Sequence, residues 1–394
     1  MATAFPDLSA LVADPHAAYA HLRETGPVHR ITGPDGLPVW IVTRYADVRQ
    51  LMADPRLSLD KAHAAPGNYQ GLTLPPTLDA NLLNMDPPDH TRIRRLVTKA
   101  FTPGRVEQMR PDIQALADQL LDAVADQGHA DLIAEFAAPL PITVICDLLG
   151  VPRDSRRDFR AWTEVLVAPD PSNPGATKEA LVAMLVYLTQ LIADKRRTPG
   201  TDLLTDLINV RDDGDQLTED ELTSLAFLIL FAGYENTVQL IGTCVLVLLD
   251  HSEQLAALRE NPAMVDDAVE EIARYDGPVV LAIRRFPTED VRIGEVTIPA
   301  GETVMLSLAS ANRDPDRFPD ADRLDVERRD SGHLALGHGI HYCVGAPLAR
   351  LETQIAVSTL LRRFPNLALD VPRDEVRWRP SMRARGLVSL PVRF

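Results

Sequence analysis

Most of the chain places its hydrophobic and polar residues with the period of amphipathic helices. One predicted helix, "PHAAYAHLRET", ends at Gly26, and a long one, "VEQMRPDIQALADQLLDAVADQG", is capped by Gly128. The helix "HTRIRRLVTKAF" is stopped by Pro103, and the proline-rich segment 168–178 is predicted to be irregular. Further helices are predicted over 139–165, 178–197, "MVDDAVEEIARYD" and about Ala346 to Arg363.

One segment is apolar on nearly every side. Thr218 precedes it, with Glu221 three residues later, which is the spacing of a capping box. We therefore predict a long helix from Thr218 to about Asp250, buried because it lacks a polar face. A glycine, an acid and an amide interrupt its centre, "FAGYENTVQ".

Strand patterns are fewer. "LPVWIVTRYADVRQLMAD" predicts a strand followed by a helix, "VRIGEVTIPAGETVMLSL" alternates around turns, and the tail "LVSLPVRF" is β-like. No change of composition marks a linker. The predicted fold class is mainly α with a minor β part, in one domain spanning residues 1–394.

Composition is typical of a soluble globular protein, with 45% hydrophobic and 24% charged residues. A net charge of -16 disfavours a nucleic-acid partner. Three widely spaced cysteines disfavour a disulfide framework and indicate a reducing compartment. The N-terminus lacks a signal-peptide pattern, and Glu235 and Asn236 break the longest apolar run. We expect a cytoplasmic protein without a membrane span.

The glycine-rich loop "HLALGHGIHYCVGAPLARLE" gathers His333, His338, His341 and Cys343. A structural turn with a buried thiol, a zinc site and a haem iron held by one thiolate are the competing interpretations. The haem interpretation fits the local physics best. A helix follows the cysteine, so its amide groups and dipole are expected to lower the pKa of the thiol, and glycines allow close approach to a flat ring.

With this loop the chain resembles the cytochrome P-450 haem-thiolate monooxygenases, over nearly its whole length. "LGHGIHYCVG" matches the family's Phe-x-x-Gly-x-x-x-Cys-x-Gly signature, except that Leu336 replaces the phenylalanine. The resemblance implies a triangular prism with haem b between the long helix and the helix after the loop. Cys343 would be the axial ligand, with Gly337, Gly339 and Gly345 shaping the loop.

The resemblance also implies residues that hold the two haem propionates. His90 and Arg94 in "MDPPDHTRIRRLV" are four residues apart on one helix. "RRFPTEDV" matches a strand whose arginine is Arg285 rather than Arg284, and His341 precedes the thiolate by two. Buried carboxylates need such cationic donors.

Two further motifs match the family. Glu271 and Arg274 in "EEIAR" would form a buried ion-pair network with Arg323. In "FAGYENTVQ", Gly233 would leave space for dioxygen, and Glu235 would link the site to solvent. Asn236 stands where threonine is usual, and Thr237 is one residue late. We expect Asn236 to position water, or a substrate hydroxyl to complete the proton relay.

The implied reaction is reductive activation of dioxygen and insertion of one oxygen atom into an organic substrate. Electrons would come from a ferredoxin and its reductase. The protein is expected to act as a monomer. Five basic residues are candidates for the docking patch, or else ordinary solvated cations: Arg92, Arg95, Lys99, Arg105 and Arg350. Alternatives are an epoxidase or peroxide-driven oxygenase of the same family, or a non-catalytic haem-thiolate sensor or binding module.

The substrate is expected to be hydrophobic and fairly large, such as a macrolide, another polyketide or a sterol-like molecule. The family's variable pocket walls correspond to the loop 57–84, which includes Leu72, and to the stretch 165–178. They also include the stretch from Val279 to Ile283 and the segment near Met382. The predicted substrate contacts are Leu82, Leu83, Leu228, Ala232, Val279, Val280, Ile283 and Met382.

Overall fold

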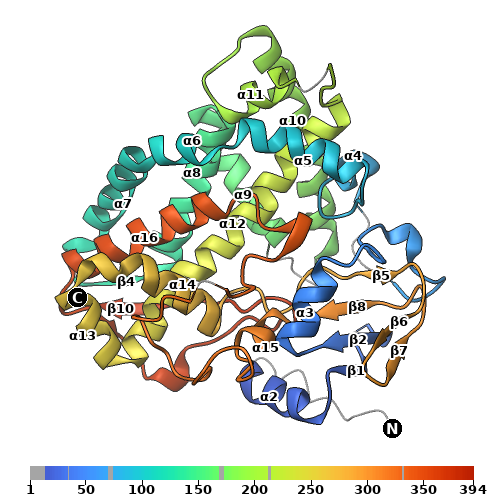
Figure 1. Cartoon of the computed structure of the whole chain (residues 1–394). Coiled ribbons are helices and arrows are strands. Elements are labelled where there is room, and N and C mark those ends of the chain that lie inside the picture. Colours follow the sequence, from blue (N-terminus) through green and yellow to red (C-terminus); the bar gives the residue numbers. More distant parts are fainter. Residues whose placement is uncertain (1–13, 34, 70–73, 168–172, 212–213, 331) are drawn as a thin grey trace.

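The computed structural model describes residues 14–33, 35–69, 74–167, 173–211, 214–330 and 332–394 (Figure 1). The α-helices are α2 (Pro15–Thr25), α3 (Tyr45–Met52), α4 (Pro76–Asp79), α5 (Asp89–Ala100), α6 (Pro103–Gln108), α7 (Arg110–Ala125), α8 (Pro139–Leu149), α9 (Arg156–Val167), α10 (Pro174–Arg197), α11 (Leu203–Asn209), α12 (Glu219–Asp250), α13 (Ser252–Glu260), α14 (Val265–Asp276), α15 (Leu308–Asn312) and α16 (Ala346–Arg363). Shorter helical turns are η1 (Lys61–His63), η2 (Ile133–Ala137), η3 (Arg153–Ser155), η4 (Pro262–Met264), η5 (Gly339–His341) and η6 (Arg373–Glu375). The strands are β1 (Val28–Thr32), β2 (Pro38–Val42), β3 (Leu57–Ser58), β4 (His129–Asp131), β5 (Phe286–Pro287), β6 (Val291–Ile293), β7 (Val296–Ile298), β8 (Val304–Leu306), β9 (Ala368–Leu369) and β10 (Pro391–Arg393).

Helix α12 runs through the middle of a triangular molecule (Figure 1). Its predicted capping box is present: the Thr218 hydroxyl accepts from the Glu221 amide at 3.2 Å, and the Glu221 carboxylate accepts from the Thr218 amide at 2.8 Å. Helices α4, α8, α10, α14 and α16 contact it along its length. Since most of its side chains are buried, the prediction of a buried central helix is confirmed.

The β part is small and lies mainly at one corner, beside α2 and α3 (Figure 1). Strands β1 and β2 pair antiparallel, and β8 joins β2 in parallel with Trp40 opposite Val304. A second sheet orders β4, β10 and β9, which brings the chain's C-terminus beside the segment after α7. Two two-stranded sheets, β3 with β5 and β6 with β7, complete the described strands.

Two of the predicted helices are each divided in two. The first is interrupted at Met109, and Pro111 then lies in the first turn of α7, where a proline is tolerated because its missing amide has no helical partner. The single helix predicted over 139–165 is also wrong, because it breaks at Gly150. The φ of Gly150 is +63°, and this residue ends α8 in a left-handed cap. Gly128 does not cap α7, which ends at Ala125 with Asp126 as its cap residue.

Helix α10 begins earlier than predicted, inside the stretch expected to be irregular. The Asn173 side chain accepts a hydrogen bond from the Ala176 amide at 3.3 Å and so caps the first turn. The helix therefore begins at Pro174. Leu72 and residues 168–172, expected in the substrate-pocket walls, lie outside the described residues.

A hairpin near the C-terminus, residues 378–387, positions part of the site. Trp378 bridges Leu387 across the hairpin, and the Arg379 amide donates to the Gly386 carbonyl at 2.7 Å. Its turn pairs with the segment after α14, where Val279 bridges Ala384. We call residues 378–387 the C-terminal hairpin.

Two helices are long and apolar enough to cross a membrane, by length and composition alone: Gly175–Arg197 within α10, and α12. This is weak evidence of a span, because the core helix of a soluble protein passes the same test. In α12, 61% of the apolar window is buried inside the protein, as expected of a core helix.

Candidate active site

The loop before α16 holds Cys343 in a tight turn. The Cys343 amide donates to the Leu336 carbonyl at 2.9 Å. Gly337 and Gly339 have φ of +81° and +72°, a region that side chains rarely adopt, so both glycines are required here. Cys343 is exposed, whereas the other two cysteines, Cys146 and Cys244, are buried.

The thiol of Cys343 does not have the lowered pKa that its position predicted. Desolvation by the surrounding protein raises the pKa of Cys343, and it outweighs the opposing effects of the backbone amides of Gly345 and Ala346 and of the charges of Arg94 and Arg350. The amides predicted to face the sulfur are therefore present. A ligated metal cation supplies the charge that turns such a thiol into a thiolate.

The zinc interpretation loses its support. Among the residues that the structure describes, no group of three or more His, Cys, Asp or Glu side chains is placed to hold a metal ion. His333, a candidate from the same loop, instead lies 3.1 Å from the Glu270 carboxylate, which also pairs with Arg350 at 2.7 Å. A single thiolate remains as the metal ligand of this loop.

Two histidines and two cationic arginines, from three separate segments, converge beside Cys343. The rings of His90 and His341 have centroids 4.2 Å apart. Arg94, on the same helix as His90, donates to the Tyr342 carbonyl at 2.7 Å. Arg285 is buried, at 4% exposure. The positions predicted to hold propionates are thus brought together.

These groups are crowded and short of partners. Burial and the charges of His90, Arg285 and Arg94 lower the pKa of His341 to about 3. Burial also lowers the pKa of Arg285 to about 10. Within the described part of the chain, both ring nitrogens of His90 and Nε of Arg285 are buried without a hydrogen-bond partner.

Such a cluster fits the carboxylates of haem. Buried donors without partners are costly, and like charges repel, unless an anion lies among them. Two propionates would satisfy both requirements. The residues present therefore fit the cofactor that the thiolate loop predicts.

Arg284 is engaged elsewhere, which agrees with the choice of Arg285. It donates to the Asn84 side chain at 2.9 Å and to the Leu83 carbonyl at 3.4 Å. Its guanidinium also lies 5.2 Å from the centroid of the Tyr69 ring. Arg284 therefore fixes the segment before α5 rather than joining the cationic cluster.

Helix α12 presents Gly233 and Asn236 on an exposed face. The helix is continuous there. The side-chain amide of Asn236 donates to the Ala232 carbonyl at 3.3 Å. Thr237 is buried and donates to the Gly233 carbonyl at 3.0 Å, so the structure separates it from that face.

Glu235, expected to link the site to solvent, is held by two donors. Arg379 of the C-terminal hairpin donates to its Oε1 at 2.5 Å, and Gln239 donates to the same oxygen at 2.8 Å. The sequence offered no sign of Arg379, because its partner lies 144 positions away and no local spacing links the two.

The buried ion-pair network contains a different arginine from the one predicted. Glu271 and Arg274 pair at 2.7 Å, and Arg274 donates to the carbonyls of Asn312 and Ala321. Arg328, not Arg323, donates from Nε to Glu271 at 3.2 Å. Arg323 offers only its carbonyl to Arg274, because its side chain pairs with Asp325 at 2.9 Å.

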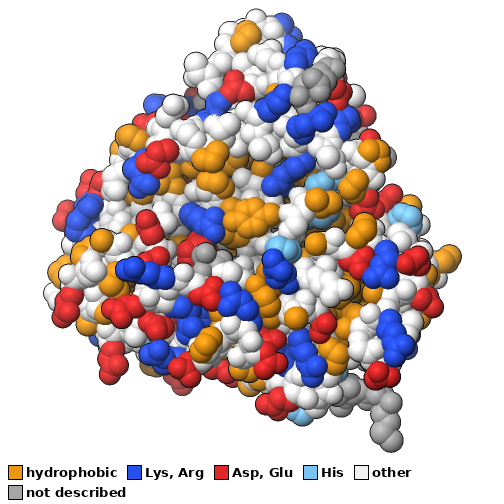
Figure 2. Space-filling view, in the orientation of Figure 1, with side chains coloured by type: hydrophobic (Ala, Val, Ile, Leu, Met, Phe, Trp, Pro, Cys, Tyr) orange, Lys and Arg blue, Asp and Glu red, His pale blue; other side chains and the backbone are white. Residues whose placement is uncertain are grey.

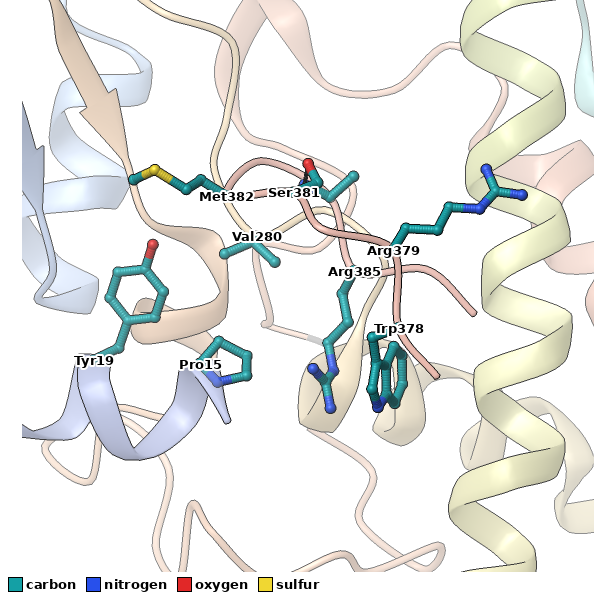
Figure 3. A pocket seen from close by; sticks show the side chains of 9 residues that line it. Pro15, Tyr19, Val280, Trp378, Arg379, Ser381, Met382 and Arg385 are labelled. Atoms are coloured by element: carbon teal, nitrogen blue, oxygen red, sulfur yellow. Dashed lines mark hydrogen bonds between the residues drawn. The ribbon is translucent and has the colours of Figure 1, made fainter. Parts of the chain in front are cut away.

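Seven of the eight predicted substrate contacts belong to three hydrophobic clusters. Leu82 and Leu228 are buried in the largest cluster, and Leu83 and Ala232 pack against it. Val279 packs against a second cluster, whereas Ile283, outside all three, is half-buried. Val280 and Met382 belong to a third and line a small cavity of about 10 Å³ with Tyr19, Trp378 and Arg379 (Figure 3).

The five candidate docking residues are largely engaged in ion pairs. Arg92 pairs with Asp215 and Glu221, Arg105 with Asp206, and Arg350 with Glu270. Figure 2 shows the face that carries α16, where hydrophobic side chains lie next to Lys and Arg near its centre. Ile340 and Tyr342, which flank His341, are 50% and 37% exposed.

Comparisons with known proteins point to one family. The family model described as "Cytochrome P450" matches residues 176–391. Cytochrome P450 107B1 of Saccharopolyspora erythraea is 51% identical, over 98% of both chains. Cytochrome P450 monooxygenase PikC of Streptomyces venezuelae is 48% identical, over 98% of this chain and 94% of its own.

Solved structures share the same architecture. The Bacillus subtilis bacillaene polyketide synthase cytochrome P450 PksS superposes with a TM-score of 0.92. It is 38% identical to this chain, and the match covers 97% of each chain. The range 176–391 that the family model matches contains the thiolate loop, Arg285 and α12.

Proposed function

The chain belongs to the cytochrome P450 family and is a haem-thiolate monooxygenase, and we propose that it oxygenates a large hydrophobic, polyketide-type substrate with electrons from a ferredoxin. The observation that carries the proposal is the convergence of His90, Arg94, Arg285 and His341 beside an exposed Cys343. It provides one thiolate and a set of cationic donors for two propionates.

When bound, haem held by a thiolate activates dioxygen and supplies the oxygen atom that enters the substrate. The residues of the chain hold and orient the cofactor and supply protons to the site. Cys343 would be its protein ligand, and the Gly345 and Ala346 amides beside the sulfur would tune the iron. His90, Arg94, Arg285 and His341 would orient the ring through its carboxylates.

The proton supply is assigned to α12. Glu235 is the nearest carboxyl group in sequence to the exposed face of Gly233 and Asn236 and can exchange a proton with water. Asn236 has both a donor and an acceptor, so it orients a water molecule there without itself passing on a proton. Gly233 keeps this face free of a side chain.

The substrate proposal rests on the apolar walls and on the relatives. The described wall positions carry no charge, and Leu83, Ala232 and Met382 among them are only partly buried. One structural neighbour is named for a polyketide synthase. A hydrophobic polyketide of macrolide size suits such walls, whereas a small polar metabolite does not.

The ferredoxin proposal rests on the surface above the thiolate loop. Exposed Ile340 and Tyr342 lie among arginines, a mixed surface suited to a small acidic electron carrier. We further propose that the chain acts as a monomer of one domain in the cytoplasm.

Turnover tests the proposal. Purified protein would be supplied with a surrogate ferredoxin and its reductase and with a panel of macrolides, linear polyketides and sterols. A spin-state change with one polyketide, followed by its hydroxylated product, supports the proposal. Binding without any product would favour a haem-thiolate sensor or binding module instead.

One observation favours a second candidate, a peroxide-driven oxygenase. Asn236 replaces the usual threonine, and Glu235 is engaged in an ion pair. Both features weaken a proton relay that reductive turnover needs. Product formation with hydrogen peroxide as fast as with the ferredoxin system would favour this candidate, and an epoxide product would identify epoxidation.

A further inference from the structure

The C-terminal hairpin packs directly against α12. Gly386 is buried, and a Cβ atom placed on it would lie 2.9 Å from Cδ of Gln239, so only glycine allows this approach. The Leu387 amide donates to Oε1 of Gln239 at 2.6 Å. The hairpin is therefore fixed to the helix one turn after Glu235.

The same hairpin supplies an ion pair to Glu235. Nη1 of Arg379 lies 2.5 Å from Oε1 of Glu235, with the two side chains 31% and 20% exposed. Gln239 donates to this oxygen as well, at 2.8 Å. Figure 3 shows the Arg379 side chain extending from the hairpin toward α12. Both donors to the carboxylate are thus fixed by the hairpin.

Arg379 also borders a cavity of about 10 Å³ that Val280 and Met382 line, which has room for about one water molecule. Its side chain points away from the cavity and toward α12 (Figure 3). The turn that carries Met382 is paired with the segment 279–281 through the Arg383 carbonyl and the bridge between Val279 and Ala384. The hairpin is therefore held at its turn as well as at α12, which fixes the base of the Arg379 side chain.

We propose that Arg379 is the positioning residue of Glu235, and that the C-terminal hairpin holds the orientation of that carboxylate. The inference rests on the proposed role of Glu235 in proton supply. Arg379 touches neither substrate nor oxygen in this scheme. It sets where the carboxylate points.

The test compares Arg379→Gln with Arg379→Lys in the haem-loaded enzyme. The measurements are product formed per NADPH consumed, peroxide released, and the solvent deuterium isotope effect on product formation. Arg379→Gln is expected to lower coupling about tenfold, the effect of losing one charge-assisted hydrogen bond. Arg379→Lys keeps the charge and should recover most of the coupling, which a merely structural role does not predict.

Arg373→Gln is the matched control. Arg373 follows β9 and pairs at 2.7 Å with Asp250, at the far end of the same helix α12. The change removes one arginine and one ion pair between the C-terminal region and α12 without touching Glu235. Its coupling should equal that of the wild type.

A double variant tests whether Arg379 acts through Glu235. In a Glu235→Gln background, Arg379→Gln should cause no further loss of coupling, because the carboxylate that it positions is gone. Wild-type coupling and isotope effect in Arg379→Gln, or full additivity in the double variant, would overturn the proposal.

A readout without turnover separates this inference from the proposed function. The infrared band of the Glu235 carboxylate, identified by its loss in Glu235→Gln, should shift in Arg379→Gln and not in Arg373→Gln. An unchanged band refutes the role of Arg379 whatever the enzyme's activity. A shifted band in a protein that forms no product supports Arg379 and contradicts the proposed function alone.

Discussion

The rings of His90 and His341 lie with their centroids 4.2 Å apart, although one residue is on α5 and the other precedes α16. Arg285 lowers the pKa of His341 and is itself buried. Buried hydrogen-bond donors without partners are brought together in this way where an anion binds. Haem binding is therefore expected to depend on residues that are far from Cys343 in the sequence.

We predict that His90→Ala and His341→Ala each weaken haem binding about tenfold, because each change removes one hydrogen bond to a carboxylate. The rate of haem transfer to excess apomyoglobin measures the effect. His21→Ala, on an exposed position of α2, is the control. Transfer rates equal to that of the control would contradict the assignment of the propionate site.

We predict that Arg328→Gln lowers the free energy of unfolding by about 1–3 kcal/mol, because the buried Oε1 of Glu271 loses one of its three donors and the only one from Arg328. Arg323→Gln should change it by less than about 0.5 kcal/mol, since that side chain is exposed and pairs only with Asp325. Urea denaturation of both variants measures the difference. Equal losses would restore the original assignment of Arg323.

We predict that Asn236→Ala lowers the coupling of electron consumption to product and raises peroxide release, because the oriented water is lost. Asn236→Thr should also change the coupling, since a hydroxyl both donates and accepts at one atom. Oxygen uptake, peroxide and product are measured together. Asn261→Ala, on an exposed turn before α14, serves as the control. Unchanged coupling in both Asn236 variants would refute a role in oxygen activation.

We predict that His16 makes stability fall as the pH falls below about 6.5. Its Nε2 lies 2.8 Å from Asp276, which Arg385 also contacts, and burial lowers the pKa of His16 despite that carboxylate. Below about 6.5 the unfolded chain therefore binds more protons than the folded one, and stability is lost. Although burial opposes it, the hydrogen bond from His16 and the charge of Arg385 hold the pKa of Asp276 at about 2, below this window.

The variant His16→Gln should flatten this dependence by up to about 1.4 kcal/mol per pH unit. Urea unfolding of both proteins at about pH 7.5 and about pH 5.5 measures it. A variant as sensitive to acid as the wild type would show that His16 does not carry the effect.

Residues that act through local sequence were predictable, and residues that act across the fold were not. The capping box of Thr218 and Glu221 and the start of α16 after Gly345 follow from neighbours a few positions apart. Arg379 and Arg328 reach their partners only after hairpins and turns have folded, so no spacing reveals them.

The helix breaks were missed for a related reason. At Met109 and Gly150 the apolar period continues across the break, and only the backbone changes direction. The pKa of Cys343 was mispredicted because its desolvation depends on atoms from distant segments, whereas its amide neighbours are local.

The most direct test is the absorption spectrum of the reduced protein with carbon monoxide. A strongly red-shifted Soret band is expected, because only a thiolate ligand produces it, and Cys343→His should abolish it. Cys146→Ala and Cys244→Ala should keep it, since both side chains are buried away from the loop. An unshifted band from well-folded wild-type protein, or a shifted band that survives Cys343→His, would contradict Cys343 as the axial ligand.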